Sequence, residues 1–193
     1  MGWKAMNASG AVAVPIVTSL PASPTDGQEI ILADSTTAAT YAWQLRYNAN
    51  AVSSYKWDFV GGSQLAAEVT PAESTTSTSY TDLATTAGQT VTTPVAGDYD
   101  IQINSQSRVN SGGAAAGQYI SYMTVKVGSN AASDAEANIF GTYCNVESLA
   151  NIERTIRKTG LAASTALVLK FKSGSGTSTF ANRRIAITPV RVG

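Results

Sequence analysis

The sequence predicts an all-β protein built around a two-sheet β-sandwich. Three observations predict this fold class. Apolar and polar residues alternate with a period of two in several short segments, which is the pattern of half-buried strands. From residue 80 onward such segments recur at short intervals between turn-forming stretches. No segment shows a convincing helical period, and this combination is typical of a sandwich.

The composition allows a packed core and excludes several classes of partner. Of the 193 residues, 44% are hydrophobic and 13% are charged, against roughly 25% charged in an average domain. The formal net charge is zero, which gives no indication of a nucleic-acid or membrane partner. The N-terminus lacks the pattern of a signal peptide, and no apolar run approaches the ~18 residues of a membrane span. The sequence therefore predicts a protein made in the cytoplasm, without nucleic-acid binding or membrane insertion.

Residues 1–20 are predicted to form an extended arm. The stretch GAVAVPIVTSLP is apolar and β-prone, but Pro15 and Pro21 interrupt it. Proline cannot donate a hydrogen bond to a central ladder, so this segment is an edge strand or an extended arm. Alone it could not stay ordered, and we expect it to lie on another surface, with Trp3 as a candidate anchor.

Residues 21–65 are predicted to form a small antiparallel β module. Pro24–Gly27 is a turn, because proline presets φ, aspartate caps locally and glycine supplies a positive φ. After the strand QEIILA, two further strands alternate aromatic and polar residues around a polar loop, so their aromatic faces can stack across the strands. The inward set is Tyr41, Trp43, Leu45 and Tyr47 on one strand and Tyr55, Trp57 and Phe59 on the next. Three short strands make a marginal sheet, which needs a second domain or copies of itself.

Two interpretations of the aromatic set stay open. The residues concerned are Tyr41, Trp43, Tyr47, Tyr55 and Trp57. They can form the hydrophobic core of the small sheet, or they can form an exposed platform on which a sugar stacks. The first interpretation predicts that truncating a tryptophan unfolds the protein. The second predicts that the truncation abolishes glycan binding without unfolding.

Residues 66–79 are predicted to be a linker, and residues 80–193 the β-sandwich. The linker AAEVTPAESTTSTS is small, polar and contains proline, which is the composition of a spacer. In the sandwich, alternation assigns three inward faces. These are Tyr99, Ile101 and Ile103; Leu167, Leu169 and Phe171; and Ile185 and Ile187. The segment AEANIFGTYCNVESLA is ambiguous between a strand and a short helix.

The residues that usually perform catalysis are scarce. The chain has no histidine, which removes a Ser–His dyad, a histidine metal site and a histidine general base. Its single cysteine, Cys144, can form neither an intrachain disulfide nor a thiolate zinc cluster and is expected to be a small buried hydrophobe. Asp98 and Asp100 share one strand face, interpreted as solvated, with a hard-cation site or a glycosidase acid pair as alternatives. The sequence predicts no enzyme and no cofactor, while Ca²⁺ binding stays open.

Charge is unevenly distributed along the chain. Residues 66–153 hold nine acids and two bases, whereas residues 154–193 hold eight bases and no acid. The favoured interpretation is strands whose solvent faces differ in sign. The alternatives are complementary surfaces that pair across subunits and, least favoured, a basic nucleic-acid patch. Glu153 beside Arg154 and Arg157 is interpreted as a structural ion pair.

Two parts of the sequence resemble families of known proteins. LPASPTDGQEIILAD, YAWQLRYNAN and SYKWDFVGGSQL, which cover Leu20–Leu65, resemble a recurring module of tailed-bacteriophage virion proteins, especially those of phages of actinobacteria. VAGDYDIQI, NIERTIRKTGLAASTALVLKF and RRIAITPVRV, in this order within residues 80–193, resemble the trimeric tumour-necrosis-factor-like jelly roll. The resemblance implies an extended arm and small antiparallel β module followed by a jelly-roll β-sandwich, assembled as a homotrimer.

The resemblance also implies a non-enzymatic structural protein located on the virion surface. Its partners would be copies of itself and the capsid or tail proteins, with the arm and module attached to the particle and the jelly roll pointing outward. The chain has no collagen-like or coiled-coil shaft, which favours a compact role as capsid decoration, head fibre or minor tail protein. The alternative function is a carbohydrate-binding module that attaches to a host surface glycan.

This interpretation assigns contacts to eight residues. The candidates for particle attachment or trimer contact are Trp3, Val14, Ile16, Trp43, Tyr47 and Trp57. Arg183 and Arg184 are the candidates for inter-subunit electrostatics, because the base-rich segment could meet the acid-rich segment of a neighbouring copy. Reversing the charge of both arginines without loss of the oligomer would argue against that role.

Overall fold

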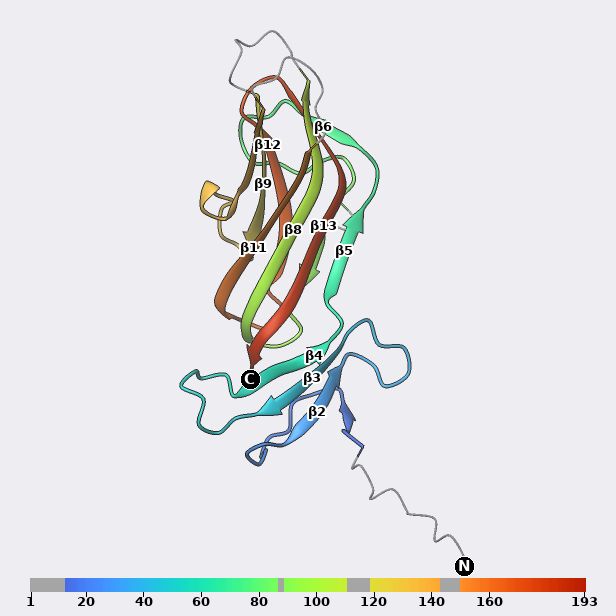
Figure 1. The fold of residues 1–193 in the computed structure, drawn as a ribbon, viewed down its shortest axis with the longest axis vertical. Helices are drawn as coiled ribbons and strands as arrows, with labels where there is room; N and C mark the ends of the chain where they lie inside the picture. The colour runs from blue at the N-terminus through green and yellow to red at the C-terminus, as the bar shows by residue number, and fades with distance from the viewer. Residues whose placement is uncertain (1–12, 87–88, 111–118, 143–149) are drawn as a thin grey trace, which may run out of the picture.

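Two β-sheets make up the part of the chain that the computed structural model describes, which is residues 13–86, 89–110, 119–142 and 150–193. The sheets lie face to face along most of an elongated molecule, and β2 to β4 lie at one end (Figure 1). The elements are β1 (Ile16–Val17), β2 (Glu29–Ala33), β3 (Ala42–Tyr47), β4 (Trp57–Gly62), β5 (Leu65–Val69), β6 (Glu73–Thr75), β7 (Thr90–Thr92), β8 (Gly97–Asn110), β9 (Tyr119–Val127), the 3-10 turn η1 (Asp134–Glu136), β10 (Asn138–Thr142), β11 (Ala150–Leu161), β12 (Ala166–Ser173) and β13 (Thr177–Val192). The all-β prediction is confirmed.

The sheets have the strand order of a jelly roll. The larger sheet has nine strands in the order β1-β2-β3-β4-β13-β8-β11, with β5 and β6 also pairing along β13, and the smaller has the order β10-β9-β12-β7. If β5 and β6 count as one interrupted strand, the sandwich strands are distributed between the two sheets as in a double Greek key. The pairs within the sandwich are antiparallel. The segment left ambiguous by the sequence, residues 135–150, contains in its described part the end of η1, all of β10 and the first residue of β11.

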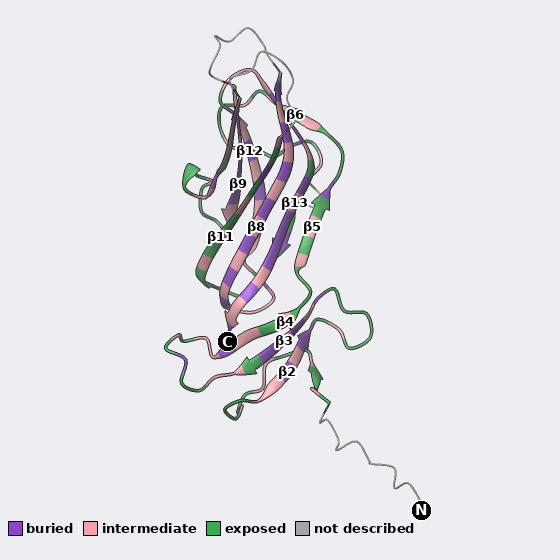
Figure 2. Cartoon of the chain, in the orientation of Figure 1, coloured by how far each residue is buried: buried purple, intermediate pink, exposed green. Residues whose placement is uncertain are grey.

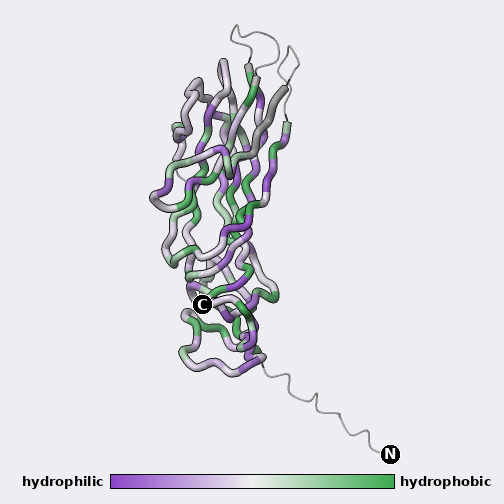
Figure 3. The backbone as a smooth tube through the Cα atoms, turned by 90° about the vertical axis from the view of Figure 1, so that its left-hand side faces the viewer, coloured by the Kyte–Doolittle hydropathy of each residue, from purple (hydrophilic) through white to green (hydrophobic). Residues whose placement is uncertain are grey.

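The core of the sandwich contains the inward faces predicted from alternation. All eight of those side chains, on β8, β12 and β13, are buried, which confirms the prediction. Buried and partly buried positions alternate along β8 (Figure 2), and hydrophobic and hydrophilic stretches follow one another along the backbone of the sandwich (Figure 3). Across the interior, the rings of Phe171 and Phe180 lie 4.8 Å apart between centroids. Each fully buried side chain of this size contributes about 1.5–3 kcal/mol.

The N-terminal module is continuous with the sandwich. β4 pairs with the end of β13, where Arg191 lies opposite Asp58 and its Nε donates a hydrogen bond to Asp58 Oδ1 at 2.6 Å. The ring centroid of Trp43 on β3 lies 6.1 Å from that of Tyr99 on β8. The small sheet was expected to need a partner surface, and the sandwich of the same chain provides one. Copies of the module are therefore not required to complete its core.

The register between β3 and β4 explains the paired aromatic residues. Tyr47 lies opposite Trp57, and their rings meet edge-on with centroids 5.2 Å apart, as cross-strand stacking predicts. Trp43 lies opposite Gly62, so no aromatic residue faces it across the strand pair. Trp43 packs on Tyr41 of its own segment at 4.5 Å between centroids. The two tryptophans thus share a buried face without contacting each other across the strands.

The described part of the predicted arm, residues 13–20, contains an edge strand. β1 pairs in parallel with β2, with Ile16 opposite Ile31. The N–H of Ile31 donates to the carbonyl oxygen of Pro15 at 2.8 Å, a contact that uses the oxygen of proline and needs no proline N–H. The edge-strand prediction is confirmed for this segment, and the surface on which it lies is its own module.

Residues 66–79 are not a free spacer, contrary to the prediction. β5 and β6 lie within or overlap this segment and pair with β13, and Val69 is buried. β13 is 16 residues long; it pairs with β8 along one edge and with β4, β5 and β6 in turn along the other. The composition of this segment predicted a spacer, but small polar residues can also form an edge strand when a longer strand pairs with them.

Replacing Gly62 with alanine should destabilise the protein by about 1–3 kcal/mol. Gly62 has a φ of 127°, and a Cβ built there would lie 2.1 Å from the carbonyl oxygen of Ala42 on β3. Gly61→Ala is the matched control, because a Cβ at Gly61 meets no atom within 4 Å. Urea denaturation should show the loss for Gly62→Ala alone. Equal stability of the two variants would contradict the close approach of β3 to β4.

Candidate functional site

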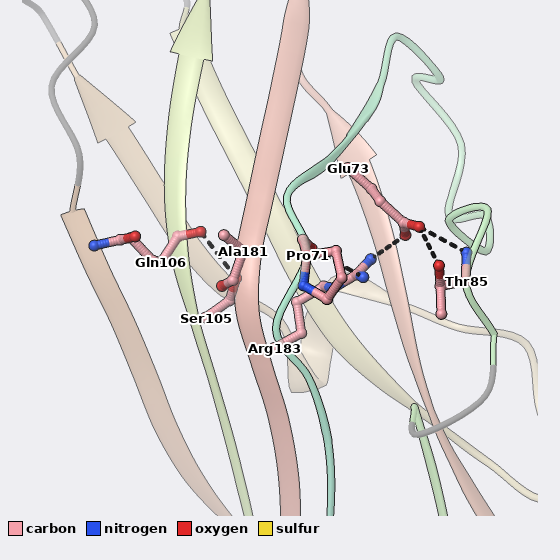
Figure 4. Close-up of polar contacts among 7 residues, drawn as sticks. All are labelled: Pro71, Glu73, Thr85, Ser105, Gln106, Ala181 and Arg183. Atoms are coloured by element: carbon pink, nitrogen blue, oxygen red, sulfur yellow. Dashed lines mark hydrogen bonds and ion pairs between the residues drawn. The ribbon is translucent and has the colours of Figure 1, made fainter.

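A bulge in β13 builds the most distinctive polar feature of the sandwich. The register of β13 against β8 shifts between Ala181 and Arg184, so Asn182 and Arg183 together oppose Ser105. Asn182 has a φ of 49°, in the left-handed region that asparagine tolerates better than most residues. Ser105 Oγ donates to the carbonyl oxygen of Ala181 at 3.0 Å and holds the bulge against β8 (Figure 4). Bulges of this kind change the direction of side chains.

The Arg183 side chain points into the protein beneath β6. It is fully buried, and Nη1 donates to Glu73 Oε2 at 2.6 Å while Nη2 donates to the carbonyl oxygen of Pro71 at 3.3 Å (Figure 4). The guanidinium also lies 5.8 Å from the ring centroid of Phe171. Glu73 in turn accepts a hydrogen bond from the Thr85 N–H at 2.9 Å. The arginine assigned to inter-subunit electrostatics is thus paired inside its own chain.

The Glu73 carboxylate is ionised in this environment. Burial alone opposes ionisation, but the Thr85 hydroxyl, the Arg183 hydrogen bond and the Arg183 charge outweigh it, so the pKa of Glu73 lies below its ordinary value. Arg183 Nε has no hydrogen-bond partner within the described ranges. Most hydrogen-bonding atoms of the Arg183–Glu73 pair thus have partners, and Arg183 Nε is the exception. Removing one member of the pair would leave the other charge buried without its partner.

The outward side of the bulge borders a hollow of about 280 Å³. Its lining residues come from β8, β11 and the bulge: Asn104, Ser105, Gln106, Asn151, Ile152, Glu153 and Asn182. Strand register places Asn151 opposite Gln106, and Glu153 opposite Asn104. Four of these residues are side-chain amides, and none of the four makes a side-chain hydrogen bond to any residue in the described part of the chain. We call them the amide cluster: Asn104, Gln106, Asn151 and Asn182.

The outward side chains next to the amide cluster are, in contrast, paired with one another. Gln102 Nε2 donates to Glu153, and Arg184 Nη1 donates to Gln102 Oε1 at 3.1 Å. Arg184 Nη2 continues the chain by donating to Gln64 Oε1 at 2.8 Å. Arg184, the second candidate for inter-subunit electrostatics, is therefore engaged in a network that crosses β11, β8 and β13. Among the described residues that line the hollow, the four amides of the cluster are thus without side-chain partners, while Glu153 is paired.

Asp98 and Asp100 lie further along the outward face of β8 and have separate partners. Asp100 accepts hydrogen bonds from Arg157 Nε and Nη2, both at 2.8 Å. Asp98 Oδ1 accepts the N–H of Gly160 at 2.9 Å. Within the described residues, no group of three or more acidic or cysteine side chains could hold a metal ion. The arrangement supports the solvated-face interpretation over an acid pair.

A titration of the Asp100 carboxyl should show that it is paired with Arg157 and is not part of an acid pair with Asp98. The hydrogen bonds and charge of Arg157 outweigh partial burial and hold the pKa of Asp100 below its ordinary value of 3.8. The stabilisation is present at neutral pH and is lost as the pH falls through that lowered pKa. Because Arg157 is half exposed, Asp100→Asn should cost at most about 1 kcal/mol. A carboxyl NMR titration with a raised midpoint would instead indicate a catalytic acid pair.

The predicted ion pair around Glu153 is wrong. Glu153 bonds to Gln102, Arg154 Nη1 reaches the carbonyl oxygen of Ala137, and Arg157 pairs with Asp100. Neighbouring residues of a strand point to opposite faces, so cross-strand residues are nearer than sequence neighbours.

The uneven charge of the chain is compensated internally. Five ion pairs join the acid-rich residues 66–153 to the base-rich residues 154–193: Arg157–Asp100, Lys158–Glu136, Lys170–Asp82, Lys172–Asp134 and Arg183–Glu73. The topology of the jelly roll brings the two segments together, because the C-terminal strands β11, β12 and β13 lie next to strands that precede them in the chain. Those ten side chains are therefore used within one subunit.

The candidates for attachment in the arm and module divide into exposed and buried residues. Ile16 is 51% exposed and Val14 is partly buried. Tyr47 is also partly buried, whereas Trp43 and Trp57 are core residues with exposures of 0% and 3%. The core interpretation of these two tryptophans is therefore correct, and a sugar platform built on them is excluded. Trp3 and Cys144 lie outside the described residues.

Comparison with known proteins identifies no family. The chain matches no protein-family model, and no curated protein matches it. Across the described ranges, no helix has the length and apolar character needed to cross a membrane.

Proposed function

We propose that this chain is a non-enzymatic structural protein on the surface of a tailed-phage particle, acting as capsid decoration, head fibre or minor tail protein. It is a homotrimer that attaches through the N-terminal arm and module and displays the jelly roll outward. The resemblance of Leu20–Leu65 to a module of phage virion proteins supports this proposal. So does the elongated shape, in which the N-terminal module and the far end of the sandwich lie at opposite ends (Figure 1).

The observation that carries the proposal is the position of the exposed apolar side chains. In the described part of the chain, three large hydrophobic residues are exposed: Ile16 at 51%, Val52 at 102% and Val60 at 49%. All three belong to the arm and module, and none belongs to the sandwich. A groove of about 370 Å³ also lies beside the arm, between residues 13–15 and 27–29. Apolar surface gathered at one end favours that end for contact with another protein.

Labelling of intact particles tests the location. Gold-labelled antibody against the protein should decorate purified virions of the source phage. Label over the head would assign capsid decoration or a head fibre, and label at the tail end would assign a minor tail protein. Absence of label from every particle would contradict the proposal.

The attachment end is tested by two variants with one control. Ile16→Asp and Val60→Asp should reduce incorporation into particles, because each places a charge on apolar surface proposed to be buried on docking. Thr155→Asp, on the exposed face of β11, is the matched control and should be incorporated normally. Equal incorporation of all three would place the attachment surface elsewhere.

The trimer is tested by the mass in solution. The subunit mass is 20.0 kDa, so light scattering should give three times that value. A mass of one subunit at micromolar concentration would remove the trimer from the proposal without affecting the location on the particle.

A further inference from the structure

We propose that the hollow beside the β13 bulge binds a neutral saccharide through the amide cluster, Asn104, Gln106, Asn151 and Asn182. This inference does not depend on attachment to a particle. It also differs from the aromatic sugar platform considered above, whose two tryptophans are buried. The site is built from side-chain amides on two paired strands and a bulge, and it lies on the outward face of the larger sheet.

The chemistry of the cluster matches a ligand rich in hydroxyl groups. Each amide presents an acceptor oxygen and a donor NH₂ group, and each sugar hydroxyl is both a donor and an acceptor. A vicinal pair of hydroxyls can therefore engage one amide through two hydrogen bonds. The four amides border one hollow and lack side-chain partners in the described ranges, whereas adjacent polar side chains such as Gln102 and Arg184 are already paired.

The lining also limits the charge and size of the ligand. Among the described residues that line the hollow, Glu153 is the one that carries a charge, and none is a lysine or arginine. A carboxylate or phosphate would be repelled by Glu153, and the arginine opposite Asn104, Arg184, is already bonded to Gln102 and Gln64. The hollow of about 280 Å³ lies just below the range of roughly 300–1,000 Å³ for ligand pockets. A short neutral saccharide with much of its surface in solvent fits these limits.

The geometry of the site is fixed in advance by the fold. Asn104 and Gln106 are two residues apart on β8, so they share the outward face. Asn151 lies opposite Gln106 on β11. On the other side, the bulge supplies Asn182, whose neighbour Arg183 is anchored inside by Glu73. The paired strands fix the backbone at these positions, so binding has to order only the side-chain rotamers.

The test is an NMR titration of the isolated, full-length protein with galactose, glucose and N-acetylglucosamine as neutral probes and galacturonate as the anionic counterpart. Side-chain NH₂ signals of the amide cluster should shift with at least one neutral probe at millimolar concentration. The NH₂ signal of Asn50, in an exposed loop of the module, should stay in place. No shift with any neutral probe, or stronger shifts with galacturonate, would overturn the proposal.

Variants separate binding from a structural role. Asn104→Ala and Asn151→Ala should each weaken binding of the responding probe about two- to tenfold, the loss expected for a neutral hydrogen bond. Asn50→Ala is the matched control and should bind with unchanged affinity. Both cluster variants should keep the wild-type melting temperature and mass. If they instead change the mass by light scattering and leave probe binding unaltered, the cluster is a contact between copies and the proposal fails.

Discussion

Replacing Trp43 with alanine should lower the free energy of unfolding by about 3–5 kcal/mol. The side chain is fully buried where β3 meets the sandwich, and its ring lies near those of Tyr41 and Tyr99. Its Nε1 donates to the carbonyl oxygen of Ser63 at 2.8 Å. The truncation leaves a cavity between the module and the sandwich and also leaves that oxygen without its partner. Urea denaturation followed by circular dichroism measures the loss.

A second apolar truncation in the module serves as control for Trp43→Ala. Val52 is fully exposed in the loop before β4, so Val52→Ala should change stability by no more than about 0.5 kcal/mol. Equal stability of the two variants would contradict the buried position of Trp43. Trp43 packs against both the module, at Tyr41, and the sandwich, at Tyr99. The two parts should therefore unfold together, in a single transition of the wild-type protein.

Replacing Glu73 with alanine should cost about 3–5 kcal/mol, because it leaves the Arg183 charge buried without its partner. Arg183 has no solvent exposure, and its remaining side-chain hydrogen bond is to the carbonyl oxygen of Pro71. β6 should separate from β13 as a consequence, since Glu73 lies opposite Phe180 in that strand pair. Chemical denaturation measures the loss, and hydrogen exchange of the amides of β6 locates it.

A double-mutant cycle distinguishes the pair from simple loss of packing. Glu73→Leu combined with Arg183→Met removes both charges and keeps apolar volume, so it should recover most of the stability lost by Glu73→Leu alone. Additive losses in the double variant would show that the two side chains do not interact. The Asp100→Asn variant is the exposed counterpart and should remain within about 1 kcal/mol of wild type.

The Glu73 pair also predicts how stability depends on pH. Since the pKa of Glu73 is lowered on folding from its ordinary value of 4.5, the stabilisation is complete above that value. It declines as the pH falls from that value through the lowered pKa, because over this range the unfolded state has bound a proton that the folded state has not, and it is lost once the folded state is protonated as well. In Glu73→Leu this part of the acid dependence should be absent.

The strand faces could be predicted from the sequence because side-chain alternation is local. Tyr99, Ile101 and Ile103 all turned inward on β8, as a period of two requires. The turn before β2 was equally local: Gly27 has a φ of 78°, and the N–H of Gln28 donates to the carbonyl oxygen of Thr25 at 3.0 Å. Such features depend on residues no more than three positions apart.

The partners of strands and charges could not be predicted in the same way. The segment 66–79 has the composition of a spacer, yet β5 and β6 pair with β13 because that strand has a free edge beside them. Glu153 was assigned to neighbouring arginines in the sequence, yet it bonds to Gln102 across the sheet. In both cases the partner lies far away in the chain, where no local pattern indicates it.

The sequence by itself determined the fold class, the inward faces of the strands and the lack of histidine chemistry, since these follow from composition and short spacings. The tertiary structure alone decided that the module and the sandwich share one sheet. It also decided that Arg183 lies inside and that the four residues of the amide cluster border one hollow. These features depend on the register of distant strands, and a shift of one residue would reverse every side chain of a strand. Register is set by the burial of whole strand faces against each other and by bulges, and neither is encoded in any single segment.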